Sequence, residues 1–171
     1  GHDTKNINDF YTIFSDTMYR HGTPVFDKKL FFHLASKFKE NIIFYNAYDN
    51  NKVIASMCII IDDEIAWYPW GGVDNEYTKQ LAGYFVYWQV IQNICEKKNI
   101  KIFDFGRSAY NGNTYKFKSK FGATPVKIDI LTSETTDLYS RYSLASDIWK
   151  KLPKNMVDFM GPKLCKYLVD L

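Results

Sequence analysis

The spacing of apolar residues changes from a helical period to a strand period near residue 40. Between residues 7 and 20, apolar side chains recur every three or four positions, which predicts an amphipathic helix with Asn8 as its N-cap. The His-Gly-Thr-Pro segment at 21–24 ends this helix, because glycine and proline do not continue it. The same spacing returns at 28–38 and predicts a second helix.

Three strands are expected next. The segments 42–48, 53–61 and 65–70 are rich in β-branched and aromatic residues, which favour strands. Only short polar turns separate them, at 49–52 and 62–64. Turns of this length join antiparallel neighbours, so we expect an antiparallel meander.

The rest of the chain alternates between helical and strand-like patterns. A long helix is predicted at 76–98, followed by a strand at 100–105. Because a helical crossover connects them, this strand is expected to run parallel to the strand before the helix. A short helix at 114–121, capped by Thr114 and ended by Gly122, and a strand at 125–131 complete the order α-α-β-β-β-α-β-α-β. The order predicts the α/β class, with a mixed central sheet flanked by helices.

Composition and charge exclude several classes of protein. Hydrophobic residues make up 46% and charged residues 24% of the 171 residues, which argues against disorder. The longest apolar run is far too short to span a bilayer. With 22 basic and 19 acidic residues, the net charge of +3 is too balanced for a dedicated nucleic-acid binder. Cys58, Cys95 and Cys165 are far apart and form no CxxC pair, so we expect buried thiols in a reducing compartment and neither disulfides nor a metal site.

The segment with the most marked chemistry begins at the end of the second parallel strand. It reads DFGRS at 104–108 and leads through a glycine-containing loop into the next helix. The carboxyl ends of parallel strands are where α/β sheets place ligands. Arg107, Lys116 and Lys118 bring positive charge close to a helix N-terminus, where free amides already favour an anion. For the lysines, the alternative is an ordinary solvated position on the helix.

These motifs resemble a known family. DFGRS at 104–108, GNTYKFK at 112–118 and FGA at 121–123 are similar to the FemAB-like branch of the GNAT acyltransferase superfamily, in particular to proteins associated with exosortase and exopolysaccharide systems. HGTPV at 21–25, PW at 69–70 and a weaker tail match at 148–153 extend the resemblance. The element order is also that of the GNAT fold, in which two parallel strands splay apart around the acyl donor.

The resemblance implies an acyl- or aminoacyltransferase that forms an amide on an amine of a cell-envelope precursor, from peptidoglycan or exopolysaccharide. It implies acyl-CoA or aminoacyl-tRNA as the donor, no metal, and a cytoplasmic protein with peripheral contact at the inner membrane. Members usually contain two GNAT-like halves, and Gly1-His2 looks like a cleavage scar, so we expect this chain to be the C-terminal half. Two alternatives remain: a non-catalytic half that binds an acceptor or stabilises the other half, and an RNA-binding unit that contacts tRNA.

Amide formation requires a proton acceptor for the amine and donors for the developing oxyanion. Backbone amides around Gly106, with Lys116 or Tyr115, are the candidate oxyanion donors. Asp104 or His21 is the candidate proton acceptor, and we expect Asp104 to be partly buried with a raised pKa. The alternative for Asp104 is a structural hydrogen bond to the loop.

Further residues are expected to hold the substrate. They are Gly106, Arg107, Ser108, Lys118, His21 and Trp70. Trp70 precedes two glycines and is expected at a strand end beside the cleft, where it would stack on a sugar or a base. One departure weighs against a conventional acetyl-CoA mode. The glycine-rich pyrophosphate loop is absent, and the acids at 74 and 76 are expected at the start of the long helix, where they would repel phosphate.

The tail interleaves lysines with large apolar residues. This pattern indicates helices packed on the domain, with contact to an anionic membrane surface as the alternative. We therefore divide the chain into a linker at 1–5, a GNAT-like domain at 6–136 and a helical tail at 137–171.

Overall fold

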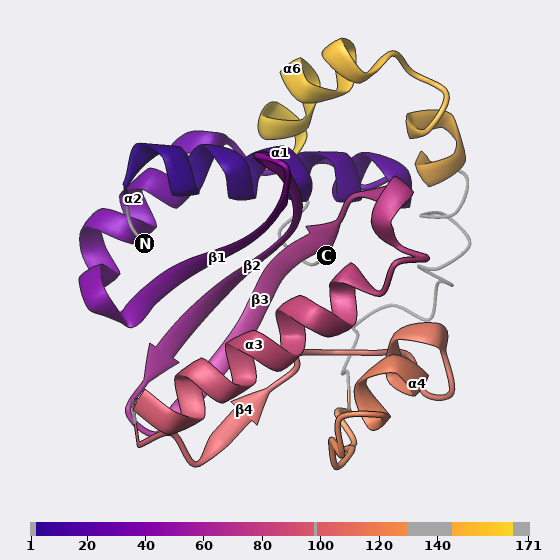
Figure 1. Ribbon diagram of the computed structural model, residues 1–171. Coiled ribbons are helices and arrows are strands. Elements are labelled where there is room, and N and C mark those ends of the chain that lie inside the picture. The colour runs from indigo at the N-terminus through magenta and orange to yellow at the C-terminus, as the bar shows by residue number, and fades with distance from the viewer. Residues whose placement is uncertain (1–2, 98, 130–144, 166–171) are drawn as a thin grey trace.

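The computed structural model describes residues 3–97, 99–129 and 145–165. Figure 1 shows a sheet with helices on both sides and a separate helical tail above it. The elements are α1 (Thr4–His21), α2 (Lys28–Phe38), η1 (Lys39–Asn41), β1 (Ile42–Asp49), β2 (Lys52–Asp62), β3 (Ile65–Val73), η2 (Asn75–Tyr77), α3 (Ala82–Lys97), β4 (Ile102–Asp104), α4 (Asn113–Ser119) and α6 (Lys154–Leu164), with a helical turn at 145–149 before α6.

The sheet has the order β1-β2-β3-β4. β1, β2 and β3 are antiparallel neighbours, whereas β3 and β4 are parallel. The predicted meander, the parallel crossover and the mixed α/β class are thereby confirmed.

Alternation along β2 divides the core between two faces of this sheet. Met57 and Ile59 belong to a buried cluster with residues of α3, whereas Cys58 and Ile60 belong to a cluster with residues of α1 and α2. This separation follows from the two-residue period of a strand. As Figure 1 shows, α3 crosses the near face of the sheet, while α1 and α2 cover the far face.

Aromatic rings fill the face covered by α1 and α2. Phe10, Phe14, Phe31 and Phe44 are all at most 1% exposed. The Phe10 ring lies 5.0 Å from both Phe31 and Phe44, in edge-on or tilted contacts that aromatic pairs prefer. This cluster fixes both N-terminal helices against the sheet.

The N-terminal helix starts earlier than the sequence pattern predicts. α1 begins at Thr4, and the Asp3 carboxylate accepts the Asn6 amide at 2.8 Å, so Asn8 is not the cap. The error arose because the polar first turn carries no apolar signal. The predicted break is confirmed: Gly22 has φ +73° and its amide donates to Tyr19 O. α2 has the predicted bounds, with Asp27 as its cap.

The crossover helix starts later than predicted. Residues Asn75–Tyr77 form a 3₁₀ turn, and α3 begins only at Ala82. Leu81 has φ +61°, a left-handed conformation that an α-helix cannot include. The acids at 74 and 76 therefore do not lie at the start of α3.

The elements after β4 also differ from their predictions. α4 is capped by Gly112 rather than Thr114, and it ends at Ser119. Residues 125–129 form no strand, and Val126 and Ile128 are 83% and 61% exposed. Their alternation is strand-like, but no described strand pairs with them. The rest of that predicted strand, 130–131, lies outside the described residues.

The cysteines are only partly as expected. Cys58 is buried and Cys165 is half-buried, but Cys95 is exposed because it lies on the outer face of α3. Among the residues described, no group of His, Cys, Asp and Glu side chains is arranged to hold a metal ion. In the same part of the chain, no helix is both long and apolar enough to cross a membrane.

The tail packs on α1 through buried and polar contacts. Trp149 and Val157 are 7% and 1% exposed. The Lys154 ammonium donates to Ser15 Oγ at 2.9 Å and to Asp158, whose carboxylate also accepts from Ser15. These contacts attach α6 to α1. The domain boundaries themselves stay a prediction, and residues 137–144 and 166–171 lie outside the described part.

A glycine pair tests this attachment. A Cβ on Gly22 would clash with Ser146, whereas a Cβ on Gly122 would meet nothing within 4 Å, although both residues have positive φ. Gly122→Ala should therefore lower the free energy of unfolding by about 1–2 kcal/mol, the cost of a left-handed alanine. Gly22→Ala should lower it by about 1–3 kcal/mol more, because it also overpacks the contact with the tail. Urea denaturation measures both, and equal losses would contradict the contact.

Candidate functional site

The two parallel strands part after a short contact. Only Ile65–Trp67 of β3 pairs with Ile102–Asp104 of β4. β3 continues to Val73, and in the described part of the chain no strand pairs with its second half on the β4 side. We call this unpaired edge of β3, from Tyr68 to the N-terminus of α3, the opening. It lies where a cleft between the two parallel strands was expected from the sequence.

A bulge in β3 marks the start of the opening. Cys58 pairs with Trp70 and Ile60 with Trp67, so Tyr68 and Pro69 together lie opposite a single residue of β2. A Cβ on Gly106 would lie 3.2 Å from Tyr68 O, so the chain after β4 passes close to this bulge. The sequence analysis missed the bulge, although a proline inside a strand pattern is a signal for one.

The turn after β4 is held by two polar contacts. The Gly106 amide donates to Asp104 Oδ1 at 2.7 Å. The Lys118 ammonium donates to the carbonyl oxygens of Gly106 and Arg107, both at 2.9 Å. Lys118 is only 8% exposed, and burial lowers its pKa while the Asp104 carboxylate opposes that effect. Lys118 is therefore no solvated helix residue; it fixes the backbone of the turn.

An aromatic cluster joins the elements around the opening. The Tyr87 ring on α3 lies 5.2 Å from Tyr68, 5.8 Å from Phe105, 5.0 Å from Phe117 and 5.5 Å from Phe121. The Tyr68 and Tyr87 rings meet edge-on. Burial raises the pKa of Tyr68 to about 12 and that of Tyr87 further still. Both phenols are therefore protonated at neutral pH, and neither is a general base.

The N-terminus of α3 lies beside the end of β3. A Cβ on Gly83 would meet Val73 at 3.3 Å. The first intrahelical bond near this end is donated by Phe85 to Leu81 O, so the amides of residues 82–84 have no partner within the helix. Such amides favour an anion.

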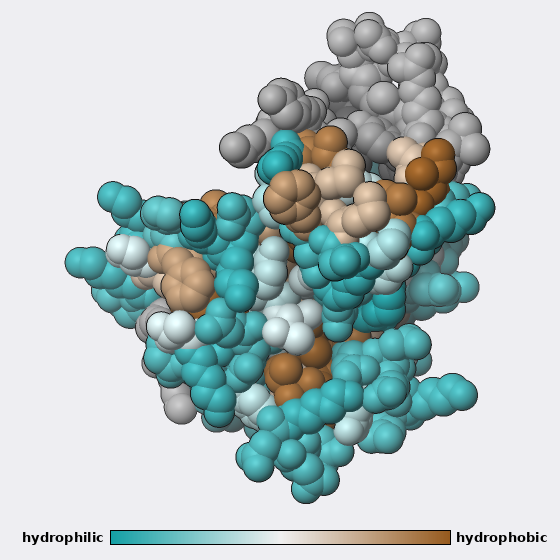
Figure 2. All heavy atoms as spheres, turned by 90° about the horizontal axis from the view of Figure 1, so that it is seen from above, coloured by the Kyte–Doolittle hydropathy of each residue, from teal (hydrophilic) through white to brown (hydrophobic). Residues whose placement is uncertain are grey.

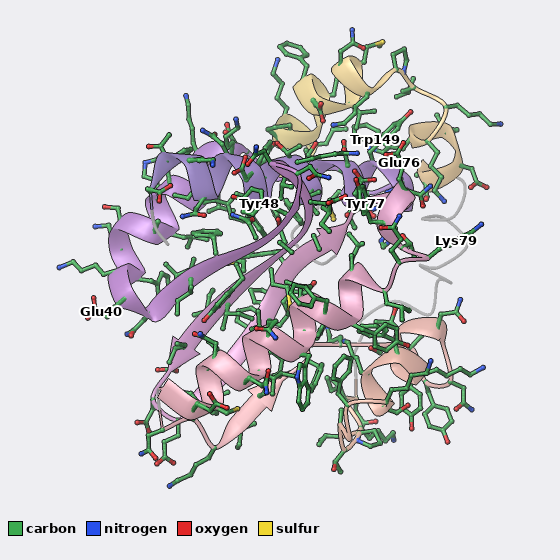
Figure 3. The ribbon with its side chains drawn as sticks, viewed as in Figure 1. Glu40, Tyr48, Glu76, Tyr77, Lys79 and Trp149 are labelled. Atoms are coloured by element: carbon green, nitrogen blue, oxygen red, sulfur yellow. The ribbon has the colours of Figure 1, made fainter. Side chains whose placement is uncertain are left out.

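The connection between β3 and α3, where Figure 3 labels Glu76 and Tyr77, is fixed by ion pairs. Lys52 lies 2.9 Å from both Asp74 and Glu76, and these carboxylates raise its pKa. Partial burial favours a higher pKa for Asp74, but hydrogen bonds from Lys52 and from the Glu76 amide outweigh it and lower that pKa. These acids were expected at the start of the long helix, where they would repel phosphate. That position is wrong, because both acids precede the helix and pair with Lys52.

The structure brings together five of the predicted site residues. Asp104, Gly106, Arg107, Ser108 and Lys118 belong to one turn and its anchor. The side chains of Arg107 and Ser108 are exposed.

Two further predicted residues lie on α4. The Tyr115 ring lies 5.3 Å from that of Tyr110, and Lys116 is exposed. Their catalytic roles stay predictions.

Two expectations about site residues are wrong, and the role predicted for His21 stays a prediction. Asp104 is exposed rather than partly buried, because β4 is short and forms the edge of the described sheet. Trp70 is not at a strand end: its ring packs edge-on against Phe31 at 5.4 Å on the face covered by α1 and α2. His21 ends α1, where burial, aided by Arg20 and Lys150, lowers its pKa and Ser146 binds its carbonyl. No contact in the described residues joins His21 to the turn.

The role assigned to Lys118 is testable with a matched lysine. Lys118→Met leaves two carbonyl groups without their donor and should lower the free energy of unfolding by about 2–3 kcal/mol. Lys116→Met on the same helix changes an exposed side chain and should alter it by less than about 0.5 kcal/mol. Chemical denaturation measures the stability of both variants. A Lys118→Met protein as stable as the Lys116→Met protein would show that Lys118 does not hold the turn.

Tyr68 couples folding to alkaline pH. The unfolded phenol loses its proton near its ordinary pKa of 10.0, whereas the folded one keeps it until about 12. Between these values the folded state binds more protons, so stability falls as pH rises, by at most about 1.4 kcal/mol per pH unit for one group. Tyr68→Phe should reduce this slope, measured by urea denaturation across the range. The exposed Tyr110→Phe control should keep the wild-type slope, and an unchanged slope in Tyr68→Phe would refute the coupling.

Comparison with known proteins places the fold. The family model described as an acetyltransferase (GNAT) domain matches residues 2–119. An aminoglycoside acetyltransferase from an uncultured soil metagenomic sample, in complex with sisomicin, has a TM-score of 0.62 and 13% identity over 79% of this chain and 91% of its own. Ribosomal-protein-S18-alanine N-acetyltransferase from Escherichia coli has a TM-score of 0.57 and 18% identity over 70% of this chain and 72% of its own.

A third structure contains a cofactor. Aminoglycoside N-acetyltransferase AAC(6')-Iy in complex with CoA has a TM-score of 0.61 and 8% identity over 78% of this chain and 91% of its own. No curated protein matches the chain. At these identities the solved structures establish the fold alone, whereas the family model spans more than half of the sequence. With its parted parallel strands and helical crossover, the chain belongs to the family of acetyltransferase (GNAT) domains.

Proposed function

We propose that this protein is an N-acyltransferase that takes an acyl group from acyl-CoA and forms an amide on an amine. The observation that carries the proposal is the opening between the second half of β3 and the turn after β4. It starts at the Tyr68–Pro69 bulge and ends at the N-terminus of α3. An extended donor with a phosphate group at one end fits an opening with free amides at that end.

The choice of acyl-CoA over aminoacyl-tRNA rests on two points. The structure of AAC(6')-Iy, which shares this fold, contains CoA. The acids at 74 and 76, which argued against phosphate, are paired with Lys52 and precede the helix. Aminoacyl-tRNA remains the second candidate donor because the FemAB-like motif implies it.

The turn after β4 supplies groups for the reaction. The amine nitrogen bonds to the thioester carbonyl carbon, the carbon–sulfur bond breaks, and the thiolate leaves with the proton that the amine releases. Asp104 uses Oδ1 to hold Gly106, which leaves Oδ2 to accept that proton and pass it to the thiolate. Tyr115 or Lys116 would donate to the oxyanion, while Lys118 positions the turn. Arg107 and Ser108, both exposed, would contact the substrate.

The acceptor we propose is an amine of a cell-envelope precursor, as the FemAB-like motif at 104–118 implies. The exposed Arg107, Lys116 and Lys120 suit a precursor that carries negative charge. Two structural neighbours, a ribosomal-protein-S18-alanine N-acetyltransferase and an aminoglycoside acetyltransferase, also favour an amine acceptor. The Arg107→Ala variant separates this proposal from a non-catalytic, acceptor-binding half. Loss of turnover without loss of stability supports the transferase, whereas unchanged turnover with weakened stability supports the non-catalytic half.

The tail is a proposed point of peripheral contact with an anionic membrane. Figure 2 shows a mostly hydrophilic surface on the α6 side, with hydrophobic side chains in a few patches. Ile148 and Phe159 are 64% and 67% exposed, and Lys151 and Lys163 are exposed near them in the sequence. Apolar side chains flanked by lysines suit the inner membrane face, where a lipid-linked acceptor would lie.

A substitution at the start of α3 tests the donor site. Gly83→Asp places a carboxylate among the free amides, which stabilises the helix but should weaken acetyl-CoA binding by at least about tenfold, or 1.4 kcal/mol. Gly83→Ala adds only the Cβ beside Val73 and is the matched control, with binding close to wild type. Isothermal titration calorimetry measures both.

Two results would contradict the donor site. If Gly83→Asp binds acetyl-CoA as well as Gly83→Ala does, the helix N-terminus does not hold the phosphate. If the wild-type chain binds deacylated tRNA but neither CoA nor acetyl-CoA, the donor is aminoacyl-tRNA.

A further inference from the structure

The outer face of α3 carries an exposed apolar stripe. Leu81, Phe85 and Trp88 are 59%, 58% and 53% exposed, although each is large and apolar. Phe85 and Trp88 are three residues apart and lie on one side of the helix, and Leu81, whose carbonyl accepts the Phe85 amide, directly precedes it. The opposite side is already buried in the core, through Ala82, Val86, Tyr87, Val90 and Ile94. A helix that is apolar on both sides is usually covered on both sides.

The stripe also lacks charge. From Ala82 to Cys95 the helix contains no Asp, Glu, Lys or Arg, and the stripe continues through the uncharged Gln89 and Gln92. In Figure 1 α3 lies across the near side of the sheet, and no other described element lies in front of it. One cation, Lys120, contacts Tyr84 next to Phe85, and a single charge does not make the basic surface that nucleic acid or an anionic lipid requires. The stripe suits a protein surface that is equally uncharged and apolar.

We propose that the stripe binds the same stripe on a second copy of this chain, with the two α3 helices antiparallel across a two-fold axis. In a two-fold symmetric contact, the same surface of both copies meets itself. An uncharged surface can do so without bringing like charges together. With the axis between Phe85 and Trp88, Phe85 of each copy packs on Trp88 of the other, and Leu81 meets Gln92. Helices that cross at about 20° stay in contact over this length.

The charges at the ends of the stripe complement each other in this arrangement. Lys79 precedes α3, and Figure 3 shows it pointing away from the body of the molecule. Glu96 is exposed and follows Gln92 by one helical turn. Neither forms an ion pair within the described part of the chain. In the antiparallel alignment, Glu96 of the second copy lies opposite the turn that carries Lys79. The two-fold axis repeats this pairing at the other end of the stripe.

Analytical ultracentrifugation of the full chain under reducing conditions tests the proposal. Wild type should show a reversible monomer–dimer equilibrium, and Trp88→Glu should raise the dimer dissociation constant by more than about tenfold. Phe159→Glu changes an equally exposed aromatic residue on α6 and should leave that constant unchanged. A wild-type chain that is monomeric at all concentrations, or a Trp88→Glu chain that dimerises like wild type, overturns the proposal.

A charge exchange tests the alignment without adding a charge to the stripe's centre. Lys79→Glu should weaken the dimer, and Lys79→Glu with Glu96→Lys should restore it. A second readout uses Leu81→Cys with Gln92→Cys in a Cys95→Ser background, which should form an intermolecular disulfide on oxidation, whereas Leu81→Cys alone should not. A double charge variant as weak as Lys79→Glu, together with no disulfide in the paired variant, overturns the antiparallel arrangement.

Discussion

One ring, that of Tyr87, touches every element that bounds the opening. It contacts Tyr68 on β3, Phe105 after β4, and Phe117 and Phe121 at α4. The ring is 8% exposed and packs edge-on against Tyr68. Since Tyr68 also begins the bulge, this ring contact ties the packing of α3 to the irregular part of β3. The geometry of the opening therefore depends on how the Tyr87 ring packs.

Around this ring, polar anchors hold the backbone at both ends of the opening. Lys118 holds the turn after β4, and Arg20 donates to Val73 O at the end of β3. Lys52 then fixes the connection that leads to α3. Each anchor is a cation bound to carbonyl or carboxylate oxygens, so the backbone of the opening is set before any donor arrives. Such preorganisation is what an acyl-transfer site requires of its scaffold.

The sequence predicted the fold well where one periodicity dominated. The bounds of α2, the meander and the parallel crossover followed from hydrophobic spacing and loop length. The late start of α3 did not, because the residue in the left-handed conformation is Leu81, and no glycine marks that position in the sequence. The strand-like pattern at 125–129 was misleading because its apolar side chains remain exposed.

For the site, the DFGRS motif pointed to a turn that the structure holds together, but not to the contacts within it. In the sequence, Asp104 and Lys118 are both charged residues close to the end of a strand, and both were assigned to the site. Burial separates them, since Lys118 lies inside and holds carbonyl groups while Asp104 is exposed. Trp70 was expected at a strand end, but β3 continues past it to Val73, and the bulge at Tyr68–Pro69 shifts the alternation so that its ring lies on the face covered by α1 and α2. Spacing alone does not report such a shift.

The most direct test of the central claim is amide hydrogen exchange of the full chain with and without acetyl-CoA. The account predicts that the donor slows exchange in three segments that are distant in sequence, namely 68–73, 82–84 and 104–108. Protection confined to other parts of the chain, such as the groove lined by Tyr11, Lys28 and Phe159, would contradict it. The absence of any change at saturating acetyl-CoA would contradict it as well.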